Sequence, residues 1–270
     1  SSDLCSSLKQ IVIPEGVRSI REKTFCECTA LQEIRLPDGL ELIGRSAFSE
    51  CEALQEVRLP EGLKEIGSDA FSSCRSLRQI TIPAGVKCIE SGTFWKCTAL
   101  QEVHLPEELE QIGMFAFEAC DTLTRIVLPA SLKQLCRGAF ENCTSLLEAQ
   151  LPDGLEELQD DAFEYCRSLQ KVTIPAQVRQ IEQAAFYYCQ SLQEVQLPEE
   201  LNEIGEDAFA HCWALKRIVI PAGVEKVGEH AFWECYSLQN IAVLSDGTEI
   251  AEDAFEDCPG TVKRGTGSLF

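Results

Sequence analysis

The stretch LQEIRLPDGLELIGRSAFSECEA, residues 31–53, decides the fold. Its first six residues alternate between apolar and polar side chains, and Pro37 then follows, which cannot donate a backbone hydrogen bond to a neighbouring strand. Residues 31–36 are therefore predicted to form a short, half-buried strand. The remaining apolar residues, up to Cys51, follow at intervals of three or four, which predicts a bend and then a short helical or 3₁₀ turn.

This unit recurs every 23 residues, eleven times, without an insertion or a deletion. Proline, phenylalanine and cysteine each keep a fixed place within the unit. The phenylalanine positions are Phe25, Phe48, Phe71, Phe94, Phe117, Phe140, Phe163, Phe186, Phe209, Phe232 and Phe255. Three residue types that share one phase over the whole chain predict a repeat architecture.

One unit cannot bury its own apolar residues, but stacked units can, because equivalent side chains then form continuous ladders. We therefore predict an α/β, right-handed solenoid of eleven 23-residue units. A parallel β-sheet is expected on its concave side and short helical or 3₁₀ turns on the other side. Residues 1–260 are predicted to form this single domain, with 1–7 as a partial repeat, and residues 261–270 to form a C-terminal tail or the end of a cap.

The unit, written L-x-x-I-x-L-P-x-G-L-x-x-I-G-x-x-A-F-x-x-C, resembles the BspA-like class of leucine-rich repeats over residues 5–260. The resemblance implies a surface protein of the bacterial or protozoan type, secreted or on the cell surface, that functions in adhesion or host-protein binding. The motif names no catalytic residue. Pro and usually Gly follow the strand where the common leucine-rich repeat carries an Asn ladder, so functions of Asn-ladder proteins do not transfer.

The composition excludes some partners. There are 44 Asp and Glu against 23 Lys and Arg, a formal net charge of −21, and such a surface repels nucleic acid and anionic membranes. No apolar run approaches the 18 or so residues that a membrane span needs, so membrane insertion is not expected. The N-terminus lacks the basic and apolar regions of a signal peptide.

Charges alternate along the outward positions of the predicted strands. The third residue of the unit is Arg125, Glu148, Lys171, Glu194 and Arg217 in successive units, and opposite charges on adjacent strands contribute ~0.2–1 kcal/mol per pair. The pattern predicts either a solvated face that neutralises its own charge or a concave face that contacts a partner. The candidate binding residues there are Arg58, His104, Arg125, Lys171 and Arg217.

Twelve of the 15 cysteines occupy one position of the unit, three residues after the Phe. We predict a reduced core ladder, because a free Cys packs as a small hydrophobic residue and neighbouring side chains of a parallel ladder point the same way, which opposes disulfide geometry. The thiols off this ladder, Cys26, Cys88 and Cys136, are predicted to be the more reactive ones. Cys26 and Cys28 near Cys5 lack zinc-site spacing, and no metal, cofactor or catalytic motif is predicted.

Tyr and Trp are distributed unevenly. Six of the seven, together with one His, fall in four consecutive units beside the ladder Cys, while Trp95 stands apart. These residues are Tyr165, Tyr187, Tyr188, His211, Trp213, Trp233 and Tyr236. They predict a binding edge, since Tyr and Trp are enriched at binding hot spots, or rings that shield one another. The sequence thus favours a non-enzymatic scaffold that recognises a protein or a glycan, and the alternative is a stiff acidic spacer without a specific ligand.

Overall fold

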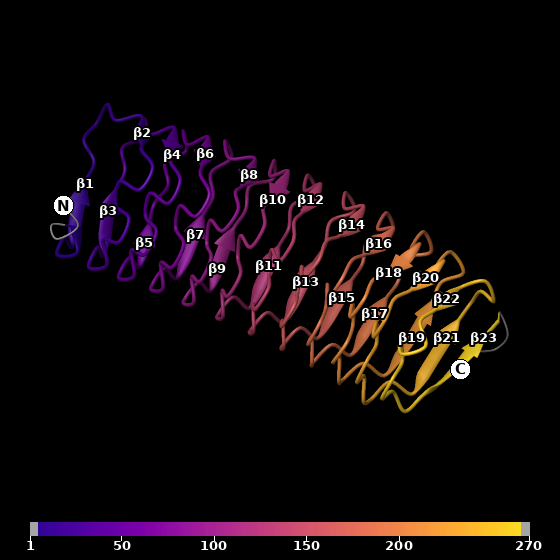
Figure 1. Ribbon diagram of the computed structural model, residues 1–270. Helices are drawn as coiled ribbons and strands as arrows, with labels where there is room; N and C mark the ends of the chain where they lie inside the picture. The colour runs from indigo at the N-terminus through magenta and orange to yellow at the C-terminus, as the bar shows by residue number, and fades with distance from the viewer. Residues whose placement is uncertain (1–4, 266–270) are drawn as a thin grey trace.

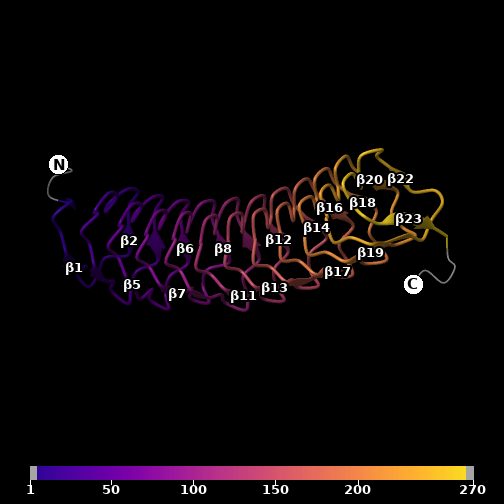
Figure 2. The ribbon, with the colours of Figure 1, turned by 90° about the horizontal axis from the view of Figure 1, so that it is seen from below.

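The structure, a computed structural model, describes residues 5–265 of the chain. It is an elongated parallel β-solenoid in which each 23-residue turn contributes two strands (Figure 1). The longer strands follow one long side of the array and the two-residue strands another, and the array bends gently (Figure 2).

The strands on the first of these sides form the main sheet, and all but one of them have three or four residues. They are β1 (Gln10–Val12), β3 (Glu33–Arg35), β5 (Glu56–Val57), β7 (Gln79–Thr81), β9 (Glu102–His104), β11 (Arg125–Val127), β13 (Glu148–Gln150), β15 (Lys171–Thr173), β17 (Glu194–Gln196), β19 (Arg217–Ile220), β21 (Asn240–Val243) and β23 (Thr261–Arg264). Partners lie one repeat apart, as in Ile34, which pairs with Ile11 and is buried while Arg35 beside it is exposed. Ladder pairing is interrupted between β9 and β11 and between β17 and β19.

A second set of strands was not predicted. It comprises β2 (Ser19–Ile20), β4 (Leu42–Ile43), β6 (Glu65–Ile66), β8 (Cys88–Ile89), β10 (Gln111–Ile112), β12 (Gln134–Leu135), β14 (Glu157–Leu158), β16 (Gln180–Ile181), β18 (Glu203–Ile204), β20 (Lys226–Val227) and β22 (Glu249–Ile250). All but β22 bury their second residue. The strands pair in parallel one repeat apart, as Ile43 does with Ile20 and Ile66, and the pairing is interrupted between β6 and β8 and between β12 and β14. The segment after Pro37, where a bend was predicted, therefore includes a strand.

The predicted helical or 3₁₀ turns were wrong, since no element of the described chain is a helix. The residues two before and two after Phe48, Ser46 and Glu50, have left-handed backbones with φ of 50° and 61°. A left-handed residue ends a helical run. The N–H of Phe48 donates instead to Ala70 of the next unit at 2.8 Å, so the turns are cross-linked between repeats.

The core consists of ladders of identical residues. Adjacent Phe rings stack with centroids 5.0–5.7 Å apart along the whole array, from Phe25 to Phe255. The Phe rings from Phe48 to Phe232 are fully buried, as are the Leu and Cys ladders beside them. The solenoid thus has one continuous core with no break between units.

The cysteine prediction was correct for most of the ladder and wrong at its first step. The ladder thiols from Cys51 onward are free, and each donates to a Phe carbonyl of the preceding unit, as Cys143 Sγ does to Phe117 at 3.2 Å. Cys5 and Cys28, however, are disulfide-bonded. Their Cα atoms are 4.6 Å apart, which lies within bonding range, so a parallel ladder does not by itself prevent a bond.

The off-ladder thiols are half-buried and not fully exposed. Burial and the nearby Glu90 raise the pKa of Cys88 to about 12, and burial also raises the pKa of Cys26. A raised pKa lowers the thiolate fraction, so neither of these two has the environment of a reactive thiol.

The C-terminal boundary predicted at residue 260 falls just before β23. Thr261–Arg264 pairs with β21 in register, so this segment extends the main sheet by one strand. Residues 1–4 of the predicted partial repeat and residues 266–270 of the predicted tail lie outside the described residues.

Candidate functional site

The turn edge of the solenoid carries the side chains one, two and four residues after each ladder Phe. The residue two after the Phe has a left-handed backbone in every unit, for example Tyr165 with φ of 55° and His211 with φ of 59°. Because the backbone is the same in each unit, side chains at equivalent places lie beside one another in three columns. The turn edge can therefore vary in chemistry without a change in fold.

The seven candidate residues on this edge form one contiguous group, which we name the ring cluster. Its ring pairs are Tyr165–Tyr187 (5.7 Å between centroids), Tyr165–Tyr188 (5.1 Å), Tyr187–Tyr188 (4.9 Å), Tyr187–His211 (5.3 Å), Tyr188–His211 (4.0 Å), Tyr188–Trp213 (6.0 Å), His211–Trp233 (4.7 Å) and Trp213–Tyr236 (6.3 Å). His230, not among the candidates, also contacts Trp233 at 5.4 Å. Register places all of these rings together, since they come from adjacent units.

Burial differs across the ring cluster. Trp213 and Tyr236 are exposed, with 38% and 54% of their surface accessible, whereas His211 is 4% exposed. Tyr165, Tyr187, Tyr188 and Trp233 are half-buried. The inner rings thus shield one another, while Trp213 and Tyr236 offer a free aromatic surface.

His211 is the buried centre of the ring cluster. Its Nδ1 lies 2.9 Å from Glu234 Oε2, an ion-pair distance, but the two atoms do not meet hydrogen-bond geometry. Among the described residues, this Nδ1 is the one buried side-chain nitrogen or oxygen without a hydrogen-bond partner. Glu234 lies 23 residues after His211, at the same place in the next unit. Glu234 was not predicted from the sequence, although this repeat spacing could have placed it beside His211.

A column of carboxylates leads into the ring cluster. Glu118, Glu141 and Glu164 each follow a ladder Phe directly, and the next residue of this column is Tyr187. Burial, with the charges of Glu118 and Asp161, raises the pKa of Glu141 to about 7. Burial and the charge of Glu141 raise the pKa of Glu164 to about 7 as well. Glu141 and Glu164 are thus half-buried acids with little compensating charge.

Oxygen atoms of Glu141, Asp161 and Glu164 lie within 4.8 Å of one another, close enough to share a metal ion. Arg137 already pairs with Asp161, at 2.9 Å between Nε and Oδ2. Within the described chain this is the one group of acidic, His or Cys side chains with such spacing. Groups of acidic side chains are common on acidic surfaces, and the arrangement alone assigns no metal.

The candidates on the sheet face, meaning the outward side chains of the main strands, form a row along it. Arg125, Glu148, Lys171 and Glu194 pair in register across β11 to β17. Among these and Arg217, one cross-strand ion pair closes, between Arg217 and Glu194 at 3.2 Å. His104 Nε2 lies 3.1 Å from Glu102 on its own strand. These charges are exposed, so each such pair is worth little.

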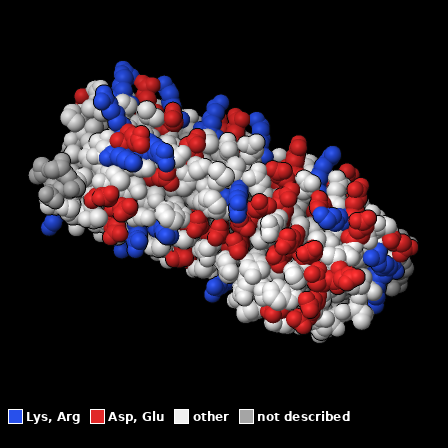
Figure 3. Space-filling model, in the orientation of Figure 1, with Lys and Arg blue, Asp and Glu red and all other residues white. Residues whose placement is uncertain are grey.

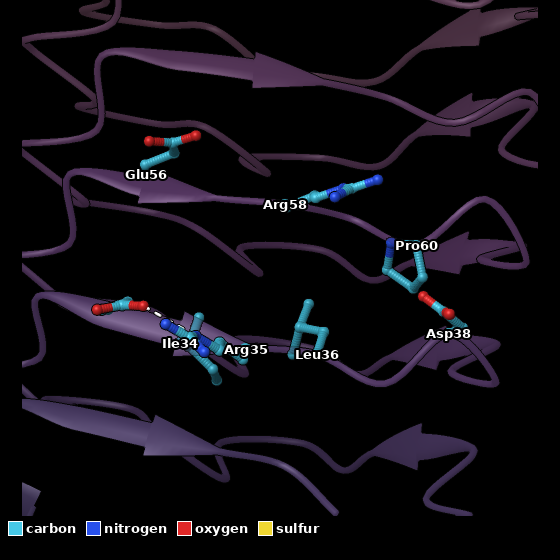
Figure 4. A pocket seen from close by; sticks show the side chains of 8 residues that line it. Ile34, Arg35, Leu36, Asp38, Glu56, Arg58 and Pro60 are labelled. Carbon is cyan, nitrogen blue, oxygen red and sulfur yellow. Dashed lines mark hydrogen bonds and ion pairs between the residues drawn. The ribbon is translucent and has the colours of Figure 1, made fainter. Parts of the chain in front are cut away.

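Shallow hollows accompany the N-terminal part of this row. Figure 4 shows Arg58 between Glu56 and Pro60, beside a hollow of about 430 Å³ that residues of β3 and β5 also line. His104 and Arg125 line another hollow, of about 490 Å³, at the interruption between β9 and β11. Lys171 and Arg217 lie further along the sheet, so the five candidates do not converge on one site.

The family of the chain follows from comparison with known sequences. The profile of the BspA type Leucine rich repeat region (6 copies) matches residues 3–114, 64–189 and 156–263. The chain belongs to the BspA-type leucine-rich-repeat family. Comparison with curated protein sequences gave no match.

Solved structures of bacterial leucine-rich-repeat proteins resemble this BspA-type solenoid. A leucine-rich repeat protein from Bacteroides ovatus is 27% identical with a TM-score of 0.75, over 96% of this chain and 79% of that one. A leucine rich cell surface protein from Faecalibacterium prausnitzii is 29% identical with a TM-score of 0.61, over 98% and 82% of the two chains. The pneumococcal vaccine antigen PcpA is 20% identical with a TM-score of 0.59, over 97% of this chain and 69% of that one, and it shares the fold.

Family membership separates repeat residues from the others. A BspA-type solenoid is generally a non-enzymatic repeat scaffold, so the ladder residues are explained by folding and the functional candidates are those that differ between units. In the described part of the chain, no helix has the length and apolar character needed to cross a membrane.

Charge is one such difference. Residues 1–135 carry 14 Lys and Arg against 20 Asp and Glu, whereas residues 136–270 carry 9 against 24. Figure 3 shows acidic side chains gathered over the C-terminal half of the BspA-type array and basic ones more frequent near its N-terminal end. The ring cluster therefore lies in the strongly acidic half.

Proposed function

We propose that this BspA-type solenoid is a protein-recognition scaffold that binds its ligand through the ring cluster. The observation that carries the proposal is the exposure of Trp213 and Tyr236 on a base of packed rings. Large rings held rigid by their neighbours lose little conformational freedom on binding, and Tyr and Trp are enriched among residues that dominate interface energy. Equivalent places in other units carry small or charged residues, such as Glu52 and Thr98.

Surface location is part of the same proposal. The solved relative from Faecalibacterium prausnitzii is described as a cell surface protein, and it matches nearly the whole of this chain. A secreted or cell-surface solenoid with a ring cluster suits adhesion or binding to a host protein. The sheet face with Arg58, His104, Arg125, Lys171 and Arg217 is the second candidate surface.

One observation favours the spacer alternative, because four of the rings and His211 pack on one another and are at least half-buried. In that function, the rings would stiffen the turn edge and no ligand would contact them. The two functions predict different results when the exposed rings are removed: a recognition scaffold loses ligand binding, whereas a spacer loses stability.

The experiment compares the protein with a Trp213→Ser/Tyr236→Ser variant on arrays of extracellular proteins and of glycans. Trp95→Ser is the matched control, because Trp95 lies on the turn edge outside the ring cluster. We expect at least one protein ligand whose binding is lost in the double variant and kept in the control. Binding of a glycan alone would move the proposal to carbohydrate recognition, and no ligand together with an earlier unfolding midpoint of the double variant would favour the spacer.

A further inference from the structure

On the turn edge, two aromatic rings have a cation of the same chain over them. Lys96 Nζ lies 4.1 Å from the centroid of Trp95, and Arg167 Cζ lies 5.5 Å from that of Tyr165. A ring face carries partial negative charge, so a cation over it is attracted. These are the two cation–ring contacts within the described residues, and both are on the turn edge.

The rest of the ring cluster has no cation of its own and lies among acids. None of the described Lys or Arg side chains stacks on Tyr188, Trp213 or Tyr236. Glu234 lies at its centre beside the unpartnered His211 Nδ1, and Tyr236 forms a hydrogen bond with the same carboxylate. At its other end, Glu141 and Glu164 share a single cation, Arg137, with Asp161.

Resting on the proposed function, we propose that the ring cluster and the adjoining Glu141 and Glu164 bind an extended, arginine-bearing segment of a partner protein. The partner supplies the cations that the chain supplies itself at Trp95 and Tyr165. Arginine fits better than lysine, because its planar guanidinium both stacks on rings and bonds to a carboxylate through two N–H groups. The strong negative charge of the C-terminal half attracts such a segment from solution.

The spacing of the rings sets the spacing of the arginines. Centroids are 6.0 Å apart between Tyr188 and Trp213 and 6.3 Å apart between Trp213 and Tyr236. In an extended chain, alternate residues share a face and repeat every ~6.6 Å. A segment with arginine at every second residue therefore matches the spacing of these rings.

The pH dependence of binding tests the contribution of Glu141 and Glu164. Raised pKa values near 7 leave Glu141 and Glu164 partly neutral at pH 6 and charged at pH 8, so binding is expected to strengthen with pH across this range. The charged or titratable groups that face them are Glu118, Asp161, Arg137, the two ring-cluster residues Tyr165 and Tyr187, and the ladder thiols Cys166 and Cys189. Of these, Arg137 keeps its charge throughout and Asp161 pairs with it.

The probe is a labelled (Arg-Gly)₄ peptide, and its binding is measured by fluorescence anisotropy at ~150 mM salt, where long-range attraction is screened. We expect Trp213→Ser/Tyr236→Ser to weaken binding about tenfold, the size of two modest cation–ring contacts. Trp95→Ser, whose ring Lys96 already covers, is the matched ring control and should stay within about twofold.

Glu141→Gln/Glu164→Gln should also weaken binding about tenfold at pH 8 and remove its dependence on pH between 6 and 8. The matched control is Glu33→Gln/Glu56→Gln, which removes two carboxylates that are neighbours on β3 and β5 far from the ring cluster. An equal loss in this control would show that net charge alone attracts the peptide, and the proposal would fail.

Three further outcomes decide the remaining steps. If Arg₄Gly₄ binds as tightly as (Arg-Gly)₄, the spacing argument is overturned. If (Lys-Gly)₄ binds as tightly as (Arg-Gly)₄, the choice of arginine over lysine is overturned. If the peptide does not bind but a protein ligand still depends on Trp213 and Tyr236, the arginine proposal fails while the recognition function stands. Unfolding midpoints of all variants, compared with that of the unmodified protein, exclude loss through misfolding.

Discussion

The two halves of this solenoid share one core and differ in surface. Phe71 in the N-terminal half and Phe209 in the C-terminal half are both fully buried, and each stacks on its two neighbours at 5.2–5.7 Å. The residue that follows the Phe is Ser72 in one unit of the N-terminal half, and Trp95 is the one ring at this place in that half. In the C-terminal half, Tyr187 and Trp233 occupy the same place, next to the other rings of the ring cluster. The ladders therefore fix the fold, and the columns outside them can acquire a site.

Electrostatics separates the halves in the same way. In the N-terminal half, Glu41 lies 2.6 Å from Arg18 and 2.7 Å from Lys64, and these two cations lower its pKa. In the C-terminal half, Glu141 and Glu164 have raised pKa values of about 7. Two cations of its own chain neutralise Glu41, whereas Glu141 and Glu164 have only Arg137 nearby, which pairs with Asp161, so their charge is available to a ligand.

The largest expected effect concerns the shared core. Phe71→Ala and Phe209→Ala should each lower the free energy of unfolding by ~3–5 kcal/mol, because each leaves a large cavity in a buried ladder. Phe255→Ala should lose less, since Phe255 has one ladder neighbour and is half-buried. Chemical denaturation measures all three, and a clear difference between Phe71 and Phe209 would contradict a common core.

The two ends of the cysteine ladder give a second test. Reduction of the Cys5–Cys28 disulfide should destabilise the first unit by roughly 3 kcal/mol, the size expected for a loop of this length. Cys235 and Cys258 at the other end are free, so reductant should leave that end unchanged. Hydrogen exchange locates the effect, and thiol titration of the unfolded, unreduced protein should count thirteen thiols rather than 15.

The sequence predicted what repeats and missed what depends on backbone detail. The period placed Phe140 and Cys143 in buried ladders, because stacking forces equivalent residues together. It could not reveal the left-handed turns, since those positions hold residues as different as Lys23, Phe115 and Tyr165. Their conformation follows from hydrogen bonds to the next unit, which a single unit does not encode.

The same reasoning explains what was found and missed near the ring cluster. Adjacent units must bring Tyr165 and Tyr188 together, so uneven composition along a regular chain was enough to indicate a contiguous edge. Glu234 beneath His211 and the column of Glu141 and Glu164 obey the same register. They were missed because acids are common at the surface of this chain, and nothing in their identity marks them as half-buried.

The third prediction uses the contrast between carboxylates. Burial raises the pKa values of Glu141 and Glu164 above their ordinary 4.5, so the folded protein holds their protons more tightly than the unfolded chain does. Stability should therefore fall as pH rises from about 4.5 through about 7. Glu141→Gln/Glu164→Gln should flatten this fall and add at most ~1 kcal/mol at pH 8, after allowance for solvent screening.

Glu41→Gln is the control in the N-terminal half. The pKa of Glu41 is shifted in the opposite direction, downward. Its contribution to stability is therefore fully present above the ordinary pKa of 4.5 and is lost as pH falls through the lowered value. The difference in unfolding midpoint between the double variant and the unmodified protein should therefore change between pH 5 and pH 8, whereas the difference for Glu41→Gln should stay nearly constant. Equal changes in both variants would remove the electrostatic contrast between the halves.

The smallest expected effect tests the left-handed backbone of the turns, which both halves share. Ala119 and Ala184 have left-handed backbones, with φ of 55° and 53°, and this costs a residue with a Cβ about 1 kcal/mol or more. Glycine avoids that cost but loses more freedom on folding, so Ala119→Gly and Ala184→Gly should each raise the free energy of unfolding by at most ~1 kcal/mol. Gly92 and Gly138 already occupy left-handed positions equivalent to Ala184.

Gly138→Ala is the reverse control and should be destabilising, because its new Cβ would meet the ring of Phe115. Ala119 lies two residues after its ladder Phe and Ala184 two residues before its own, so similar gains in denaturant titrations would show that both left-handed positions of the turn carry the same cost, and a gain at one of them only would show that the two positions differ.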